Sequence, residues 1–269
     1  MDTHRPHARL AFGQGRASQG QRELPAEVAV ALSYNGSTHA VMMATPDDLV
    51  DFAYGFSLTE GIATAAEIDQ VEVIETDLGI DLQIWLASDA EARQTQRRRS
   101  MSGPVGCGLC GIESLEEATR VAKPVAQSHL TLTPAHIMSA MADLTAHQPL
   151  HDITRAVHAA AFWTAEGGII TAREDVGRHN ALDKLIGALS RVPSMDGALI
   201  ITSRISIDMV QKACAFGVPV LIAASAPTAA AVAMADAAGL TLIALARADR
   251  FEIYTHPHRI TPEESAHVA

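Results

Sequence analysis

Two of the three cysteines lie three residues apart in a glycine-rich stretch, and they are the side chains best suited to do chemistry. Cys107 and Cys110 stand in the segment 103–113, which also contains four glycines. Glycine allows backbone conformations closed to residues with a Cβ, so a tight, exposed loop can present both thiols. Residues 114–121 then predict a helix, whose N-terminus lowers the pKa of a nearby thiol. We expect a thiolate nucleophile here.

Three interpretations of the C-x-x-C pair stay open on spacing alone: half of a zinc site, a redox dithiol, or a sulfur-carrying nucleophile with an assisting neighbour. A closed zinc site needs about four ligands. The chain has no second C-x-x-C, although a dimer could pair two such loops. The zinc deaminases place H-x-E or C-x-E upstream of their cysteine pair, and no histidine or cysteine of this chain begins that pattern.

Composition limits the classes of function. A hydrophobic content of 48% over 269 residues is enough to fill a core, and the formal charge of -11 argues against nucleic-acid binding through the whole surface. No apolar run reaches the roughly 20 residues that span a bilayer, and the first 20 residues lack the apolar middle of a signal peptide. We expect a cytoplasmic globular protein with no membrane or nucleic-acid partner. Cys214, inside an apolar helical pattern, is expected to be inert core.

The N-terminal half predicts a tail and a small domain. Residues 1–21 are polar and show no periodicity, which predicts a mobile tail; a basic arm that touches a partner is the less favoured alternative. Residues 22–126 predict a small α+β domain that ends in the C-x-x-C loop and its helix. Its expected elements are a hairpin of strands 28–34 and 39–44 around Asn35-Gly36, a helix opened by Thr45-Pro46 and ended by Glu60-Gly61, and strands 71–74 and 80–86. Glu60 is expected to be solvated.

Residues 87–106 lack apolar periodicity and carry four arginines, Arg93, Arg97, Arg98 and Arg99. A connector of this length is usually functional or disordered. A solvated charge run is the bland interpretation. The position directly before the cysteine loop favours an arm that steers anions or stabilises the thiolate.

Residues 127–269 predict an α/β domain. A helix over 133–147 is followed by alternating segments at 168–173, 180–189, 198–202, 207–216, 219–223, 228–238 and 240–246. Several of the strands are continuous apolar runs, as in sheets that are buried on both faces. The pattern therefore predicts an α/β sandwich, whose ligands bind beyond the C-terminal ends of the strands.

The loops at those strand ends are polar. They are 173–180, 202–204, 225–228 and 247–250, and they combine arginines, hydroxyls and helix N-termini, which together suit a phosphate or polyanion. Pairing of some arginines with Glu174, Asp175 or Asp249 is the alternative. His158 and His179 are either acid/base groups or hydrogen-bonded structural residues.

The combination resembles the FdhD family of formate dehydrogenase accessory sulfurtransferases. The segments that carry the resemblance are Arg173–Lys184 (REDVGRHNALDK), Phe56–Gly61 (FSLTEG), Cys107–Gly111 (CGLCG), His158–Ala160 (HAA), Met209–Ala213 (MVQKA), Ser225–Thr228 (SAPT) and Tyr254–Pro257 (YTHP). The resemblance implies a three-layer, cytidine-deaminase-like sandwich without zinc machinery, with a smaller N-terminal α+β domain. It also implies a cytoplasmic homodimer that takes persulfide sulfur from a cysteine desulfurase. The acceptor would be the molybdenum cofactor, in its bis(molybdopterin guanine dinucleotide) form, of formate dehydrogenase.

By position, the resemblance makes Cys107 the persulfide-bearing residue and Cys110 its assistant. The implied cofactor contacts are Leu245, Ala246, Arg247, Ala248, Asp249, Arg250, Arg204, His158, Arg178, His179 and Asn180, with no resident metal and with GDP or GMP as a mimic of the ligand. Two places depart from the family pattern: Thr154-Arg155-Ala156 stands where two glycines are frequent, and Ser203 where glycine often precedes the arginine. The alternative function is a molybdenum-cofactor delivery chaperone with a structural, zinc-binding C-x-x-C.

Overall fold

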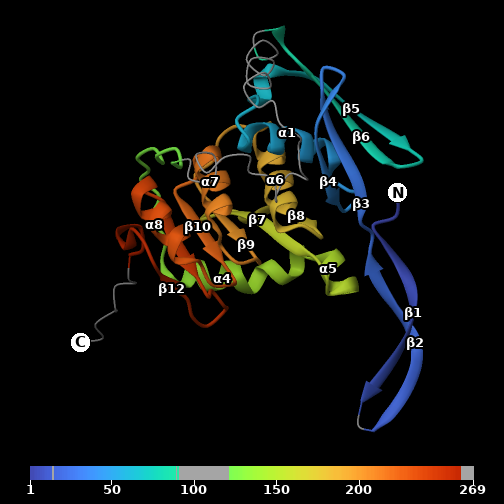
Figure 1. Cartoon of the computed structure of the whole chain (residues 1–269). Helices are drawn as coiled ribbons and strands as arrows, with labels where there is room; N and C mark the ends of the chain where they lie inside the picture. The colour runs from blue at the N-terminus through green and yellow to red at the C-terminus, as the bar shows by residue number, and fades with distance from the viewer. Residues whose placement is uncertain (14, 89, 91–120, 262–269) are drawn as a thin grey trace.

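The computed structural model describes residues 1–13, 15–88, 90 and 121–261, and it shows a large α/β body, a smaller sheet above it and a projecting N-terminal hairpin (Figure 1). The C-x-x-C loop with Cys107 and Cys110, the arginines 93 and 97–99, and nearly all of the helix expected at 114–121 lie outside the described residues. The following account therefore concerns the elements around them.

The large body is built on a six-stranded sheet of order β12-β11-β10-β9-β7-β8. Its strands are β7 His158–Thr164, β8 Gly168–Asp175, β9 Ala198–Ile201, β10 Val220–Ala223, β11 Thr241–Ala244 and β12 Glu252–Ile253. On one face pack α6 Arg178–Leu189, α7 Ile207–Phe216 and α8 Ala229–Ala238; on the other pack α4 Pro134–Asp143 and the 3-10 turn η2 Leu144–His147, followed by α5 Pro149–Thr154. The predicted α/β sandwich is confirmed.

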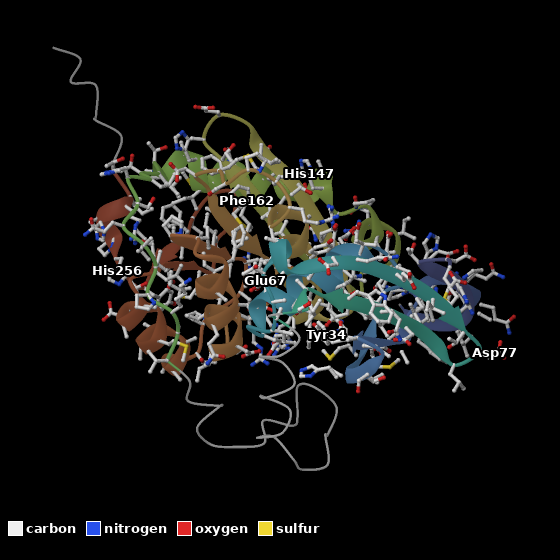
Figure 2. All side chains as sticks on the ribbon, turned by 90° about the horizontal axis from the view of Figure 1, so that it is seen from above. Tyr34, Glu67, Asp77, His147, Phe162 and His256 are labelled. Atoms are coloured by element: carbon white, nitrogen blue, oxygen red, sulfur yellow. The ribbon has the colours of Figure 1, made fainter. Side chains whose placement is uncertain are left out.

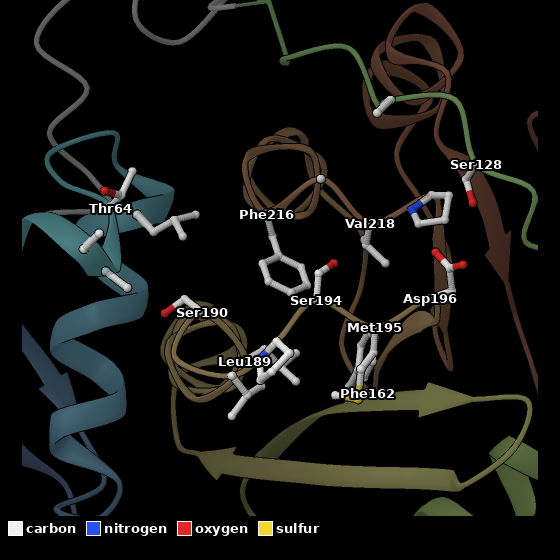
Figure 3. A pocket seen from close by; sticks show the side chains of 18 of the residues that line it. Thr64, Ser128, Phe162, Leu189, Ser190, Ser194, Met195, Asp196, Phe216 and Val218 are labelled. Carbon is white, nitrogen blue, oxygen red and sulfur yellow. The ribbon is translucent and has the colours of Figure 1, made fainter.

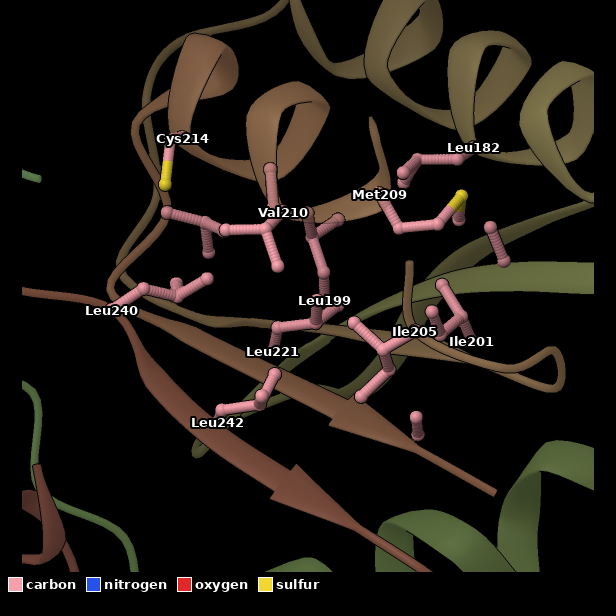
Figure 4. Close-up of a cluster of buried hydrophobic side chains, with 14 of the residues drawn as sticks. Leu182, Leu199, Ile201, Ile205, Met209, Val210, Cys214, Leu221, Leu240 and Leu242 are labelled. Carbon is pink, nitrogen blue, oxygen red and sulfur yellow. The ribbon is translucent and has the colours of Figure 1, made fainter. Parts of the chain in front are cut away.

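Alternation along the strands divides the core into two halves. Leu199 and Ile201 of β9 face the α6–α8 layer with Leu221 of β10, as the close-up of this cluster shows (Figure 4). Ala198 and Ile200, one residue out of phase, face α4 instead. Because both faces are covered, the strands show no polar alternation in sequence. Cys214 is fully buried in the α7 layer, as expected of a core residue, and burial raises the pKa of its thiol to about 11.

The smaller sheet has the order β4-β3-β6-β5, and α1 covers its inner face. The elements are β3 Val28–Tyr34, β4 Ser37–Ala44, α1 Leu49–Thr59, the 3-10 turn η1 Ala65–Glu67, β5 Ile68–Thr76 and β6 Gly79–Leu86. The predicted hairpin is confirmed: Asn35 (φ 48°) and Gly36 (φ 78°) both have the positive φ that a type I′ turn requires.

Helix α1 begins later than the sequence predicted, because Thr45 does not cap it. The residue before the helix is Asp48, in a left-handed conformation, and no side chain caps the first turn. Thr45 is instead buried and bonds to the large body, where its backbone N–H donates to the Asp175 carboxylate over 3.0 Å. Thr45 therefore forms part of the contact between the small sheet and the large body, and it does not begin the helix.

The expectation of an N-terminal tail without regular structure is wrong. Strands β1 His4–Gly13 and β2 Arg16–Pro25 pair in antiparallel register along their whole length. Almost every residue of the hairpin is exposed. Neither face is buried within this chain, so the sequence carries no hydrophobic alternation that would have indicated a strand. No helix of the described part is long and apolar enough to span a membrane.

Candidate functional site

The C-terminal ends of β8, β9, β10 and β11 lie at one edge of the large sheet. Strands β9, β10 and β11 are parallel, and β7 runs antiparallel to both β8 and β9, so β8 points the same way as β9. The loops that follow these four strands, together with His158 at the start of β7, therefore meet at this edge. The sequence predicted this grouping, and the topology brings it about.

Hydrogen bonds join the neighbouring loops into one continuous rim. The Ile205 N–H donates to the Ala226 carbonyl over 3.2 Å, and the Leu245 N–H donates to the Ser225 carbonyl, also over 3.2 Å. At the β7 end, the Ala159 N–H donates to the Thr202 hydroxyl over 2.9 Å. We name this rim, formed by residues 158, 176–180, 202–206, 224–228 and 245–250, the strand-end edge.

Three arginines of the strand-end edge have exposed side chains: Arg204, Arg247 and Arg250. The Arg247 guanidinium donates to the carbonyls of Ala224 and Ala246, which holds its position at the rim. Arg250 lies 3.6 Å from the Asp249 carboxylate, but both side chains are more than 70% exposed, so this pair contributes little. Guanidinium groups that are held in place and open to solvent suit bidentate binding of phosphate oxygens.

His179 is buried at the start of α6 and is held by a carboxylate that the sequence analysis missed. Its Nε2 bonds to the Asp208 carboxylate in the first turn of α7. Although partial burial raises the pKa of Asp208, the hydrogen bond and charge of His179 outweigh it and bring that pKa well below its usual range. An ionised Asp208 favours the proton on Nε2 and orients the ring. A carboxylate near a helix N-terminus was visible in sequence, but its partner 29 residues away was not.

His158 and Arg178 form the inner part of the strand-end edge. Burial lowers the pKa of His158, and the nearby charges of Arg178, His151 and His179 lower it further. The nearby Asp175 carboxylate acts in the opposite direction, but the pKa of His158 stays lowered. The buried Nε of Arg178 has no hydrogen-bond partner among the described residues. An unpaired buried guanidinium donor fits an anionic oxygen, as a phosphate ligand would supply.

Asn180, also predicted to contact the ligand, has its donors occupied inside the protein. Its Nδ2 donates to the Met43 carbonyl over 2.8 Å and to the Asp175 carboxylate over 3.0 Å. Asp175 pairs with Lys184 over 2.7 Å, both fully buried, and Lys184 Nζ also donates to the Thr45 carbonyl over 2.9 Å. This part of the segment 173–184 thus ties the small sheet to the large body.

A second buried ion pair serves the same contact. Lys212 of α7 lies 2.9 Å from Asp183 and 2.9 Å from Glu60, and the Thr59 hydroxyl donates to Asp183 over 2.7 Å. Burial lowers the pKa of Lys212, but the charges of Asp183 and Glu60 outweigh it and raise the pKa above its usual range, so the lysine stays charged. Glu60, expected to be solvated, is a partner in this contact.

Helices α1 and α6 meet at two glycines beside these ion pairs. A Cβ on Gly55 would lie 1.7 Å from the Asp183 carbonyl oxygen, and a Cβ on Gly187 would lie 1.8 Å from the Asp51 carbonyl oxygen. The two backbones therefore touch. We name this contact, with the pairs Asp175–Lys184 and Asp183–Lys212, the α1/α6 contact.

A cavity of about 610 Å³ lies away from the strand-end edge, at the opposite ends of the same strands (Figure 3). Phe162, Phe216 and Val218 form part of its apolar wall, and Ser190, Ser194 and Asp196 provide polar groups. Among the described residues, no arginine or lysine lines it. An anionic ligand is therefore better served by the strand-end edge than by this cavity. No group of three or more histidine, cysteine, aspartate or glutamate side chains in the described part could hold a metal ion.

The fold and the rim define an α/β sandwich with exposed arginines at its strand ends. Residues 25–261 match the model of the FdhD/NarQ family. The chain belongs to this family.

Relatives agree with this assignment, and a solved structure agrees with the fold. The chain is 51% identical over 262 residues to the sulfur carrier protein FdhD of Agrobacterium fabrum, covering 96% of each chain. It is 47% identical over 266 residues to the sulfur carrier protein FdhD of Cupriavidus necator, covering 98% of this chain and 92% of the relative. A crystal structure of a protein from Desulfotalea psychrophila, thought to be a formate dehydrogenase accessory protein, superposes with a TM-score of 0.75 at 24% identity. It covers 97% of this chain and all of that one, and it supports the fold.

Arg155 shows one consequence of the departures from the family pattern. It has a left-handed backbone with φ 58°, a conformation that glycine adopts without strain and arginine does not. Its position lies in the stretch where the resemblance described above leads us to expect glycines. An arginine occupies this left-handed backbone here, and its side chain is exposed three residues before His158.

Proposed function

We propose that the protein is a sulfur carrier that accepts sulfur on Cys107 from a cysteine desulfurase and transfers it to the molybdenum cofactor that formate dehydrogenase requires. The observation that carries this proposal is its 51% identity, over 96% of the chain, to a protein named sulfur carrier protein FdhD. Both cysteines of the C-x-x-C pair are present in this sequence. The proposal includes that the protein works in the cytoplasm as a homodimer.

The first step is thiol exchange. The Cys107 thiolate attacks the outer sulfur of the donor's cysteine persulfide, the sulfur–sulfur bond of the donor breaks, and the donor cysteine leaves as a thiolate. Cys107 then carries the persulfide, and no net oxidation occurs because the sulfane sulfur moves without a change in electron count. Cys110 assists as a neighbouring thiol. Both residues lie outside the described part of the structure, so this step rests on sequence.

The acceptor cofactor is bound as a substrate at the strand-end edge. Its bis(guanine dinucleotide) form carries several phosphates, which match the exposed guanidinium groups of Arg204, Arg247 and Arg250 and the unpaired Nε of Arg178. The protein's own contribution is to hold these charges on strand ends and helix N-termini, and to keep His179 oriented by Asp208.

Mass spectrometry after incubation with a cysteine desulfurase and cysteine tests the sulfur step. We expect an added mass of one sulfur on Cys107 and none on that position in Cys107→Ala. The Cys107→Ala protein should also fail to activate formate dehydrogenase. A variant that still acquires sulfur and activates the enzyme normally would show that Cys107 is not the carrier.

Calorimetric titration with GDP tests the anion site separately. Arg247→Ala with Arg250→Ala should abolish GDP binding while persulfide formation on Cys107 continues, and wild-type affinity should fall as salt rises. Lys123→Ala, which removes an exposed charge elsewhere, is the matched control and should bind normally. Unchanged affinity in the double variant would place the cofactor elsewhere.

The alternative is a delivery chaperone that binds molybdenum cofactor without carrying sulfur, with a structural C-x-x-C. Stoichiometric zinc lost on mutation of Cys107 or Cys110, together with the absence of any persulfide, would favour it.

A further inference from the structure

The N-terminal hairpin projects away from both sheets (Figure 1). Its strands β1 and β2 pair over ten residues each, yet nearly all of their side chains are exposed. A two-stranded hairpin alone is marginally stable in water, so a ribbon of this length implies a surface that covers it. The family match begins at residue 25, where β2 ends, so the hairpin lies outside the part shared with the family model. We name residues 1–25 the arm.

The register gives the arm two chemically different faces. Directly opposed residues share a face, and faces alternate along each strand. One face carries all four arginines of the arm and no carboxylate, and its charged or titratable members are Arg5, His7, Arg9, Arg16 and Arg22. The other face carries Ala8, Leu10, Phe12 and Ala17 toward the tip. Phe12 is 79% exposed. Such exposure is unusual for a phenylalanine unless another surface covers it.

A receiving surface exists on the small sheet. Its inner face packs against α1. Its outer face is exposed and carries apolar side chains, although the solvent-facing side of a sheet usually carries polar ones. The exposed apolar residues on this outer face are Val41, Met43, Ile74 and Trp85, each 41–50% exposed, with Ala29 and Ala31 between them. Glu72 and Asp81 lie on the same face, and Asp69, Glu75 and Asp77 continue the acidic character along β5 and its turn.

The charges of the arm and of the remaining chain are complementary. Residues 1–25 contain four arginines and two carboxylates, a net charge of +2, whereas the other 244 residues contain 16 basic and 29 acidic residues, a net charge of -13. The N-terminal ammonium lies 3.8 Å from the Glu75 carboxylate, so the arm starts at the β5 end of the same sheet. Figure 2 shows Asp77 at the far end of this sheet, on the side of the molecule opposite His256.

We propose that a second copy of this chain is the partner, and that each arm lies on the outer face of the small sheet of the other copy. Its own sheet cannot receive the arm, because the arm points away from it (Figure 1). A second copy supplies an equivalent face, and a two-fold exchange satisfies both arms and both sheets at once. Two-stranded ribbons twist strongly, so the basic face toward the base of the arm turns to the same side as the apolar face at its tip. Leu10 and Phe12 pack on the apolar residues, and Arg5 and Arg9, nearer the base, lie beside the carboxylates of the outer face. Arg22 already donates to the Thr154 carbonyl of its own chain over 3.3 Å.

The proposal rests on the homodimer that the proposed function includes and not on the sulfur chemistry. The first experiment measures the oligomeric state by light scattering and analytical ultracentrifugation. Wild type should be a dimer, and Leu10→Asp with Phe12→Asp should raise the dimer dissociation constant at least tenfold with the unfolding transition of the body retained. Val121→Asp is the matched control, because Val121 is 82% exposed outside the arm, and it should leave the dimer intact.

A charge exchange tests the pairing directly. Arg5→Glu with Arg9→Glu, or Glu72→Arg with Asp81→Arg on the outer face, should each weaken the homodimer, and mixing the two variant proteins should restore a heterodimer. Lys123→Glu should change nothing. A photo-crosslinking amino acid at position 12 should join two chains, with the crosslink in residues 29–43 or 70–85.

A monomeric wild type would overturn both this proposal and the homodimer, while the persulfide on Cys107 would still be measured independently. A dimer that is insensitive to the arm variants, or crosslinks on another surface, would overturn the arm exchange alone.

Discussion

The α1/α6 contact and the strand-end edge draw their polar residues from the same segment, 173–184, but use them in opposite ways. Asp175, Asp183 and Lys184 are buried and have ionic partners on neighbouring elements. The Arg178 Nε at the other side of the segment is buried and has no partner within the described part of the chain. A dense polar motif therefore contains both a structural contact and an unpartnered donor, which we propose to be a ligand contact. Whether a buried polar group has a partner inside the protein, more than its residue type, distinguishes the two kinds of residue in this segment.

Removing Lys212 should produce the largest effect on stability. Lys212→Ala leaves the buried Asp183 carboxylate without its cation, and breaking such a pair costs about 3–5 kcal/mol. Chemical denaturation measures the free energy of unfolding. Lys123→Ala, at an exposed site, should stay within about 0.5 kcal/mol of wild type. The double variant Lys212→Met with Asp183→Leu should lose less than the sum of the single changes, and strict additivity would contradict the pairing.

Gly187→Ala should destabilise the protein through the helix crossing. The new Cβ would lie 1.8 Å from the backbone oxygen of Asp51, which cannot rotate away, so α1 and α6 must separate at a cost of about 3 kcal/mol. Thermal unfolding gives the readout. Gly13→Ala, where a Cβ would meet nothing within 4 Å, is the control. An unchanged transition in Gly187→Ala would mean that the two helices are farther apart than described.

Arg250→Ala should separate stability from binding. Its side chain is 73% exposed, so the free energy of unfolding should change by less than about 0.5 kcal/mol. Loss of one charge-assisted hydrogen bond of about 1.5 kcal/mol should weaken GDP binding roughly tenfold, measured by calorimetry. A loss of stability without a loss of binding would reverse the assignment of the strand-end edge.

The smallest expected effect is the titration of His158. Burial and the charges of Arg178, His151 and His179 place its pKa below the usual value, so NMR titration should show it neutral where an ordinary histidine is charged. Because the unfolded state takes up this proton first, His158 should reduce stability as the pH falls below the ordinary histidine pKa. Bound GDP should raise its pKa by favouring the charged form, and Arg178→Gln should raise it too. A pKa that does not respond to GDP would separate His158 from the anion site.

Local patterns predicted elements well where neighbours along the chain decide the structure. Asn35-Gly36 specified its turn because only positive φ closes a two-residue hairpin, and residues 207–216 and 228–238 became helices within a residue of expectation. Strand β7 was missed, since His158–Thr164 is buried on both faces and shows neither alternation nor turn residues. The arm was missed for the opposite reason, because neither of its faces is buried in this chain.

Sequence by itself determined the fold class, the C-x-x-C pair, and the grouping of polar loops at one sheet edge, because parallel strands must place their C-terminal ends together. Tertiary structure alone decided which of those polar groups are used up. Asn180 reaches Met43 across 137 residues, Lys212 reaches Glu60 across 152, and His179 finds Asp208 on the next helix. Hydrogen bonds and ion pairs act over about 3 Å, so their partners follow from how distant segments pack, and no pattern along the chain specifies that packing.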